Sequence, residues 1–409
     1  MSDLPVPPPA PSSATTLEGG ARVMRPRRAA PADAVRPTRA EVNLAALRHN
    51  LRVVQKHAEG QKVWAVLKAD GYGHGSPAVA RTLERAGADG FCVALLEEGI
   101  ELREAGIMAP ILVMGGYYGS ATAELLARRL TPVVYDWSQI EAFSRLVQSG
   151  AAASPVDVHL KIDTGMARLG VRLNELPAFA QKLAAQNEIR VSGLMTHLAD
   201  ADAVSPDEMR EQMRKFEIAQ AEVAKAGLKP IVRHAANSAA VLRREAKLDA
   251  VRPGVAIFGV SPVPLEEGAG DLRLTMRVRT EIAALRTVEA GERIGYGGLW
   301  TAERQSVIAT IPMGYADGLS RALTNRGHAL VRGKRVPIAG AVSMDMAMLD
   351  VTDIPGVSVR DEAVVLGAQE GPLGKDAISA EEVAEHAGTI PWEVLTSISR
   401  RVPRFYREP

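Results

Sequence analysis

Short apolar runs recur between residues 63 and 255, and the segments between them have the spacing of helices. The runs are five to eight residues long and many are rich in β-branched side chains: Val63–Lys68, Gly90–Leu95, Pro110–Gly115, Thr131–Tyr135, Val156–Asp163, Val191–His197, Ile231–Ala235 and Ala250–Val255. Such runs suit strands that are buried on both faces of a parallel sheet. Eight strands alternating with helices predict an α/β fold, a (β/α)8 barrel, with a doubly wound open sheet as the alternative.

Helices are predicted from apolar spacing and from capping residues. Five helical segments lie between the runs: Pro77–Ala86, Glu97–Ala105, Ala121–Arg129, Glu175–Gln186 and Asp207–Ala226. Asn43 is a suitable N-cap for an earlier helix, whose buried stripe would include Leu47 and Leu51. Ser379 and Glu382 have the spacing of a capping box before a short C-terminal helix.

The chain divides into three parts by composition. Residues 1–36 are rich in proline and arginine and poor in bulky apolar residues, which predicts a disordered arm, with Met24 as an alternative start. Residues 37–270 would form the barrel. Residues 271–409 would form a mainly antiparallel β domain, because Gly-rich turns separate strand-like segments. These segments are Leu274–Val288, Ser306–Met313, His328–Gly340, Val342–Val351 and Glu362–Ala368.

Composition excludes several classes of protein. The chain has 409 residues, 46% of them hydrophobic, and a net charge of +1. The near-neutral charge gives no attraction to nucleic acid or to an acidic membrane. A single cysteine, Cys92, excludes an internal disulfide, and no apolar stretch approaches the roughly 20 residues of a membrane span. We therefore expect a soluble, cytoplasmic protein with no nucleic-acid or membrane partner.

Polar side chains follow five of the predicted strands at their carboxyl ends, where barrel enzymes carry their chemistry. They are Lys68, Lys161, Arg168, His197, Asn237, Ser238 and Arg252. Each alone has an ordinary explanation: a lysine after a strand is usually a surface residue, and His197 could be a satisfied core histidine. Their joint placement at one rim predicts a binding site.

The same rim offers groups for a phosphate and for a carbonyl. Loops after strands 7 and 8 of such barrels commonly hold phosphate, and they contain the hydroxyl of Ser238 and the backbone N–H of Gly254. Lys68, on the adjacent first strand, has an amine that reacts with carbonyl groups. Pyridoxal 5'-phosphate carries both groups and fits this arrangement.

Longer motifs surround these residues. They are Ala65–Gly75, Lys161–Gly170, Thr196–Ala199, Asn237-Ser238, Arg252–Gly254, Gly295–Gly297, Gly314–Gly318 and Ser343–Met346. In type and order, over residues 37–404, they resemble the alanine racemase family of fold-type III pyridoxal-phosphate enzymes. The resemblance implies interconversion of L-alanine and D-alanine, to supply D-alanine for peptidoglycan or to degrade it.

The resemblance also implies roles for single residues. Lys68 would bind the cofactor and act as a base on one face of the substrate Cα, and Tyr296 of the partner subunit would act on the other face. A homodimer with shared active sites is therefore implied. The implied cofactor contacts, for phosphate and ring, are Tyr72, His197, Ser238, Arg252, Gly254 and Val255. The implied substrate contacts are Arg168 and the Met344 backbone.

Four further residues would support the site. Tyr315 and Asp345 would line its entrance or support the second-subunit side, Asn237 follows the seventh strand beside Ser238, and Lys161 matches a position that is carbamylated in some relatives. The chemistry requires shifted pKa values, because lysine near 10.4 and tyrosine near 10 are too basic to work at neutral pH. Neighbouring cations such as Arg252 would lower the pKa of each base.

Two positions depart from the family pattern. Arg400 stands where many relatives have a tyrosine that reaches the phosphate, and Ala167 stands where glycine is frequent. Three other functions are open: a racemase of broader specificity, a non-catalytic pyridoxal-phosphate homeostasis protein, and a decarboxylase or aldolase on a related fold. The β domain with Tyr296 disfavours the second, and scattered histidines, without a metal-ligand cluster, disfavour the third.

Overall fold

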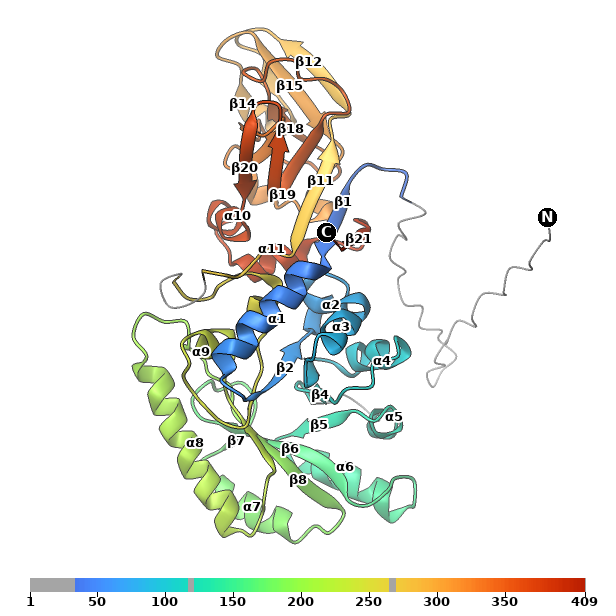
Figure 1. Cartoon of the computed structure of the whole chain (residues 1–409), viewed down its shortest axis with the longest axis vertical. Helices are drawn as coiled ribbons and strands as arrows, with labels where there is room; N and C mark the ends of the chain where they lie inside the picture. Colours follow the sequence, from blue (N-terminus) through green and yellow to red (C-terminus); the bar gives the residue numbers. More distant parts are fainter. Residues whose placement is uncertain (1–33, 117–120, 265–269, 409) are drawn as a thin grey trace, which may run out of the picture.

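The computed structural model describes residues 34–116, 121–264 and 270–408. The predicted arm thus lies almost wholly outside the described residues. The chain forms a barrel and a β domain, which occupy the lower and upper parts of Figure 1. Among the described residues, no helix is long and apolar enough to cross a membrane.

Eight parallel strands close a barrel within the described residues, as the sequence predicts. In chain order they are β2 (Lys62–Val66), β3 (Gly90–Val93), β4 (Ile111–Val113), β5 (Thr131–Val134), β6 (Val156–Asp163), β8 (Ile189–Met195), β9 (Val232–His234) and β10 (Ala250–Val251). Pairing of β10 with β2 and of β5 with β6 closes the ring, which excludes the open-sheet alternative. The short strand β7 (Val171–Arg172) extends β6 outside the ring.

The helices of the barrel begin at local signals in the sequence. They are α1 (Leu44–Ala58), α2 (Lys68–Tyr72), α3 (Ser76–Arg85), α4 (Leu96–Glu104), α5 (Thr122–Ala127), α6 (Trp137–Gln148), α7 (Leu176–Ala184), α8 (Asp207–Lys225) and α9 (Ser238–Leu242). The Asn43 side chain accepts a hydrogen bond from the Ala46 N–H, so the predicted N-cap of α1 is confirmed. Leu47 and Leu51 on this helix are fully buried.

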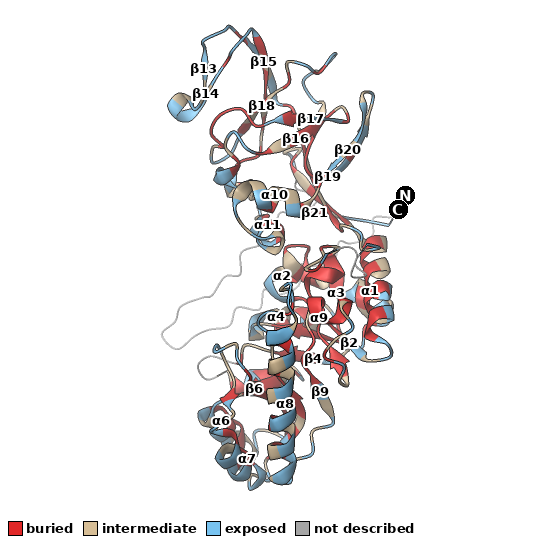
Figure 2. Ribbon diagram, turned by 90° about the vertical axis from the view of Figure 1, so that its left-hand side faces the viewer, coloured by how far each residue is buried: buried red, intermediate tan, exposed pale blue. Residues whose placement is uncertain are grey.

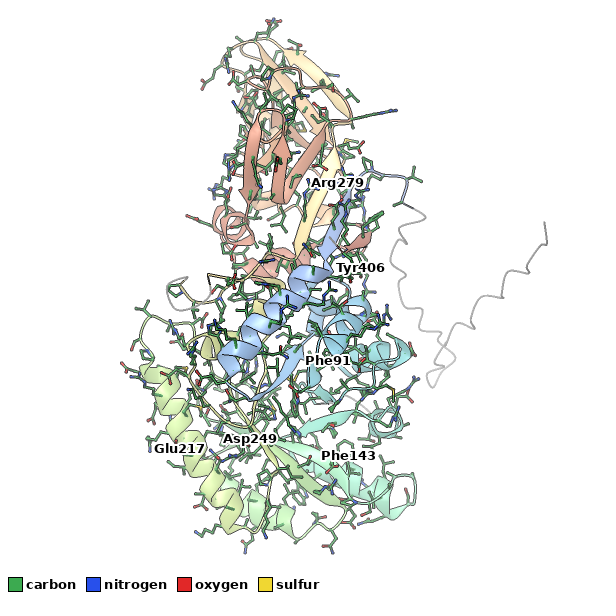
Figure 3. All side chains as sticks on the ribbon, in the orientation of Figure 1. Phe91, Phe143, Glu217, Asp249, Arg279 and Tyr406 are labelled. Carbon is green, nitrogen blue, oxygen red and sulfur yellow. The ribbon has the colours of Figure 1, made fainter. Side chains whose placement is uncertain are left out.

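Burial separates the two faces of the barrel helices. The strands and the inward helix faces are buried in Figure 2, whereas much of α8 is exposed. Figure 3 shows the same division: Phe91 and Phe143 lie in the core, while Glu217 points outward from α8. This is the amphipathic pattern that the sequence spacing predicts.

The second domain is built on a mixed sheet. Its strands are β1 (Arg39–Asn43), β11 (Met276–Glu281), β12 (Ala284–Val288), β13 (Arg293–Ile294), β14 (Trp300–Thr301), β15 (Ser306–Ile311), β16 (His328–Val331), β17 (Lys334–Pro337), β18 (Ala347–Asp350), β19 (Glu362–Gly371), β20 (Gly374–Ile378) and β21 (Arg404–Arg407). Helices α10 (Ala380–Ala387) and α11 (Pro391–Ser397) follow β20. The Ser379 hydroxyl caps α10 by accepting from the Glu382 N–H, as predicted.

The strand β1 precedes the barrel in sequence but pairs with β11 and β21 of the β domain. Residues 39–43 therefore lie in the sheet of the second domain, although the sequence places them in the range 37–270. The cause is non-local pairing, which apolar periodicity does not reveal. Both ends of the described chain consequently lie in the β domain.

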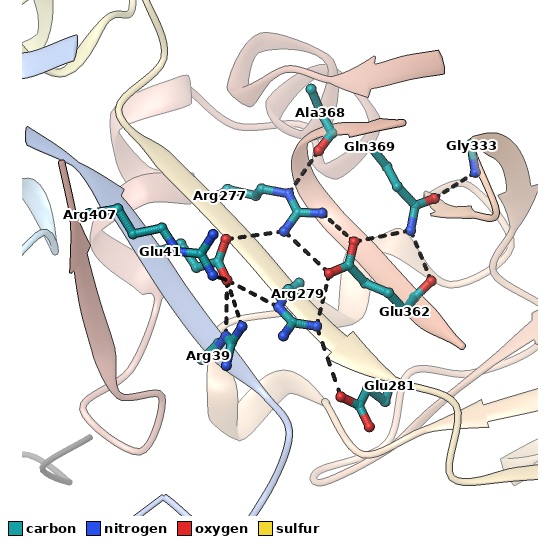
Figure 4. A network of polar contacts seen from close by, with 10 residues as sticks. All are labelled: Arg39, Glu41, Arg277, Arg279, Glu281, Gly333, Glu362, Ala368, Gln369 and Arg407. Atoms are coloured by element: carbon teal, nitrogen blue, oxygen red, sulfur yellow. Dashed lines mark hydrogen bonds and ion pairs between the residues drawn. The ribbon is translucent and has the colours of Figure 1, made fainter. Parts of the chain in front are cut away.

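A buried carboxylate ties β1 to its neighbours (Figure 4). The Glu41 side chain is 6% exposed, and it pairs with arginines from three strands. These are Arg39, Arg277, Arg279 and Arg407. Burial raises the pKa of Glu41, but Arg407 and the other guanidinium groups outweigh burial and hold its pKa below the ordinary value.

We predict that Glu41→Gln lowers the free energy of unfolding by about 2–4 kcal/mol at pH 7, since it leaves arginines without their shared anion. The native pKa of Glu41 is lowered, so its contribution is complete above the unfolded carboxyl pKa of about 4.3 and is lost as the pH falls through the native value. Denaturant unfolding at pH 7 and below pH ~4 measures this.

The matched control is Glu281→Gln. Glu281 lies 3.9 Å from Arg279 and its side chain is 35% exposed, so we expect a change within about 0.5 kcal/mol. Equal losses from the two substitutions would contradict the role assigned to Glu41.

Candidate active site

The residues after β2 form a left-handed turn that begins at Lys68. The φ angles of Ala69, Asp70, Gly71 and Tyr72 are 50°, 59°, 60° and 50°. Only Gly71 adopts this conformation without steric cost; each of the other three costs roughly 1–2 kcal/mol. Such strain persists only where the surroundings enforce it, and it is frequent at functional sites.

Hydrogen bonds within the barrel hold part of this turn. The Glu98 carboxylate accepts from the Ala69 N–H at 2.6 Å, and the Asp70 carboxylate accepts from the Ser76 N–H at 3.0 Å. The turn is therefore fixed at both ends, at the mouth of the barrel. Lys68 projects from its start.

The β domain holds the other side of the same turn. Thr275 shares a hydrogen bond of 2.8 Å with Nε2 of the buried His74. The buried Arg404 donates to the Gly73 carbonyl at 2.8 Å, and the Tyr406 hydroxyl donates to the His74 carbonyl at 3.1 Å. The second domain thus determines where the Lys68 loop lies.

A small cradle lies beside this loop. The Tyr72 ring packs against Phe258, and its hydroxyl lies 2.3 Å from the place that a Cβ on Gly254 would occupy. Burial raises the pKa of Tyr72 to about 12, so the phenol remains a proton donor. The Ser238 hydroxyl oxygen accepts from the N–H groups of Gly254 and Ala256, at 2.9 and 3.3 Å.

Two other predicted residues shape this cradle through the backbone. The Asn237 side chain accepts from the Ala240 N–H at 3.1 Å and so caps α9, which begins at Ser238. Val255 is buried and begins the 3-10 helix η2 (Val255–Phe258). The hydroxyl groups of Tyr72 and Ser238 therefore both lie close to the Gly254 backbone, and each can donate a hydrogen bond to an anionic group.

Cations gather at the barrel mouth. Burial, followed by Arg168 and Arg252, lowers the pKa of Lys161 to about 8, while Asp163 opposes this shift. Burial, followed by Arg168, also lowers the pKa of Lys68, against the effect of Glu98. The four cations, Lys68, Lys161, Arg168 and Arg252, are predicted site residues, and the closed barrel brings them together.

His197 is neutral in this surrounding. Burial, followed by Arg252 and Lys161, lowers its pKa to about 3. Its Nδ1 lies 3.4 Å from Nη2 of Arg252, which can donate to it. The predicted proximity of His197 and Arg252 is therefore present.

Arg252 is buried and donates from both terminal nitrogens of its guanidinium. Its guanidinium donates to the carbonyls of Thr196 and Ala235, at 2.8 and 3.1 Å, and to Nδ1 of His234 at 2.6 Å. Because a guanidinium only donates, Nε2 of His234 carries the proton and donates to Nδ1 of His159 at 2.8 Å. Burial lowers the pKa of Arg252 to about 10, so it stays charged at neutral pH.

The two histidines behind Arg252 were not predicted as site residues. The Trp64 ring lies 5.4 Å from that of His159 and 5.2 Å from that of His234. Burial, followed by Arg252, lowers the pKa of both imidazoles and keeps them neutral. A signal was available, because His159 lies two residues before Lys161 on β6 and therefore shares its face.

The remaining predicted residues lie in the β domain. Tyr296, Tyr315, Met344 and Asp345 line one groove, and Tyr296 is 76% exposed. In Figures 1 and 2 the β13–β14 hairpin, which carries Tyr296, lies in the part of the β domain remote from the barrel. One chain therefore presents two separate groups of site residues.

Arg400 and Ala167 mark the departures from the family pattern. Arg400 lies in the exposed turn between α11 and β21, and its contact with a phosphate stays a prediction. Ala167 has a φ of 54°, a conformation that explains why glycine suits this position.

The closed barrel, the lysine after its first strand and the mainly antiparallel β domain define a two-domain barrel enzyme, and the comparisons place it in a pyridoxal-phosphate-dependent family. Residues 42–262 match the alanine racemase N-terminal domain, and residues 275–406 match the alanine racemase C-terminal domain. The chain belongs to the alanine racemase family, and it is an enzyme that interconverts L-alanine and D-alanine.

Individual relatives agree with this assignment. The alanine racemase of Sorangium cellulosum is 62% identical over 385 residues, which are 92% of this chain and 100% of the relative. The structure of the Bacillus anthracis alanine racemase with bound L-Ala-P has 33% identity and a TM-score of 0.83, covering 91% and 96% of the two chains. The biosynthetic alanine racemase of Pseudomonas aeruginosa has 35% identity and a TM-score of 0.80, covering 91% and 100%.

We predict that Lys161→Met raises the free energy of unfolding by about 1–3 kcal/mol at pH 7, because it removes a buried charge among cations. The native pKa of Lys161 is lowered, so the charged amine destabilises the folded state fully below about pH 8. This destabilisation disappears above the unfolded lysine pKa of about 10.4. Unfolding curves of the wild type and the variant at pH 7 and about pH 10 test whether the variant is more stable at pH 7 and whether this difference shrinks at the higher pH. A loss of stability at pH 7 would instead show that a modified, anionic Lys161 supports Arg168.

Proposed function

We propose that this chain racemises alanine with two bases, Lys68 of one subunit and Tyr296 of its partner, acting on opposite faces of the substrate Cα. The observation that carries the proposal is the separation of the two groups within one chain. A second copy placing its exposed β-domain groove over the barrel mouth would complete the site. The proposal therefore includes a homodimer with shared active sites.

The barrel mouth fits pyridoxal 5'-phosphate. The Tyr72 hydroxyl, the Ser238 hydroxyl and backbone N–H groups near Gly254 would hold its phosphate, and Arg252 would face its pyridine nitrogen. When bound at Lys68, the cofactor withdraws electrons from the substrate Cα and so makes its proton acidic. Arg252 is a hydrogen-bond donor that does not release a proton, so the pyridine nitrogen would stay unprotonated. An unprotonated ring would disfavour transfer of the Cα proton to the cofactor in place of its return to Cα.

The lysine is suited to proton transfer at neutral pH. Burial and Arg168 lower the pKa of Lys68, so a larger fraction of its amine is free to accept a proton from Cα. Tyr296 would donate its phenolic proton to the opposite face and recover one in the reverse direction. The neutral His197 beside Arg252 would provide the polar surroundings of this exchange.

Arg168 and the backbone of Met344 would bind the substrate carboxylate, one from each subunit. Asp345 pairs with Arg401 at 2.7 Å, which holds this side of the groove in place, and Tyr315 lies beside it. Lys161 would add a positive charge near Arg168 as a free amine and a negative charge as a carbamate. Carbamylation requires the neutral amine, which the lowered pKa of Lys161 favours. A cytoplasmic location is proposed as well, supported by the presence of a single cysteine, Cys92, which is free and buried.

We predict that Gly254→Ala weakens pyridoxal-phosphate binding, because the new Cβ would lie 2.3 Å from the Tyr72 hydroxyl. Overpacking of this kind costs about 1–3 kcal/mol, or roughly 5- to 150-fold in affinity. Titration of the cofactor-free enzyme, followed by absorbance, measures the affinity. Wild-type affinity in a variant of normal thermal stability would contradict the assigned cradle.

We predict that Tyr296→Phe retains the cofactor, loses racemisation by roughly 10²-fold or more, and exchanges the Cα proton of one enantiomer only. The reason is that Lys68 still serves its own face of Cα. Deuterium uptake from solvent into L-alanine and D-alanine, followed by NMR, gives the measurement. Equal uptake into the two enantiomers would remove Tyr296 from the mechanism.

A further inference from the structure

Three side chains of types that can bind a metal ion meet where α10 packs against β16, at the end of the β domain nearest the barrel (Figure 1). His328 begins β16, and Glu382 and His386 lie on α10. One nitrogen of each imidazole and one carboxylate oxygen lie within 4.8 Å of one another. Glu382 and His386 are four residues apart on a helix, so they project from the same face towards the strand.

His328 has unused bonding capacity. Its Nδ1 is buried and has no hydrogen-bond partner among the described residues, which is uncommon for a buried imidazole nitrogen. The His328 and His386 rings lie 5.5 Å apart, so this nitrogen belongs to a ring beside a second possible ligand. Imidazole nitrogens are common ligands of metal ions.

The charges around the cluster permit a cation. Arg335 pairs with Glu382, but it also pairs with Asp376 at 3.1 Å and donates to the Ala377 carbonyl at 2.8 Å. Arg335 would therefore keep an anionic partner if Glu382 turned towards a metal ion. Two carboxylates against one guanidinium leave one negative charge, and the neighbouring Glu385 on α10 is exposed.

We propose that His328, Glu382 and His386 bind a divalent transition-metal ion, with Zn²⁺ as the ion that fits them best. Two imidazoles and one carboxylate are a common zinc donor set, and water fills the fourth position. Tetrahedral bonds of about 2.0–2.1 Å place ligand atoms roughly 3.3 Å apart, so the side chains must close in from their present separation. Mg²⁺ and Ca²⁺ prefer oxygen ligands and would not bind.

The ion would fasten α10 to β16. Val383 and Ala387, on the same helix, line a cavity together with Tyr315 and Arg321. Tyr315 and Arg321 also line the groove that carries Tyr296. A metal clamp at α10 would therefore stiffen the support of this groove, and none of its three ligands is among the proposed cofactor or substrate contacts.

The test measures Zn²⁺ binding by the holoenzyme. The protein is first freed of metal with EDTA, then incubated with Zn²⁺ and dialysed, and the bound metal is measured by mass spectrometry. The wild type is compared with His386→Gln and Glu382→Gln, and with His49→Gln as the matched control, since His49 pairs with Asp271 on the surface of α1. We expect the wild type and His49→Gln each to bind one Zn²⁺ per chain that His386→Gln and Glu382→Gln do not bind. The melting temperature without metal shows that each variant is folded.

Co²⁺ gives the second readout. Tetrahedral Co²⁺ has visible absorption bands, which we expect in the wild type and not in His386→Gln. Equal Zn²⁺ binding by all four proteins, or the same Co²⁺ spectrum in the wild type and His386→Gln, would overturn the proposal. Equal binding of Mg²⁺ at the same concentration would overturn the choice of a transition metal.

Discussion

The left-handed turn after β2 is the constraint on which the rest of the site depends. Three non-glycine residues, Ala69, Asp70 and Tyr72, are held in a conformation that costs them energy. The contacts that enforce it come from both domains: Glu98 on the barrel side, and Thr275 and Arg404 on the other. Lys68 and Tyr72 are therefore positioned by packing between the domains, and the turn alone would not keep them there.

Electrostatics at the barrel mouth follow from closing the ring. Lys161 comes from β6, His197 follows β8 and Arg252 follows β10, in a run of neighbouring strands, and the pairing of β10 with β2 brings Lys68 beside them. Burial, followed by the neighbouring positive charges, lowers the pKa of each group, so the lysines become weaker bases and His197 stays neutral. The same concentration of positive charge suits ligands with a phosphate and a carboxylate.

Much of this could be predicted from the sequence, because the signals were local. The eight strands, the N-caps Asn43 and Ser379, and the residues at the strand ends lie where short-range patterns indicate. Pairings between distant segments gave no such signal. Strand β1 joins the sheet of the β domain, and His159 and His234 reach Arg252 from different strands. The left-handed turn was hidden because only one of its four residues is glycine.

The central claim is that each active site takes its lysine from one chain and its tyrosine from another. Mixing inactive Lys68→Ala chains with inactive Tyr296→Phe chains, after dissociation and reassociation, tests it directly. Hybrid dimers then contain one site with both native residues, and random pairing restores about a quarter of the wild-type racemase activity. Activity no higher than that of the two separate variants would contradict the account.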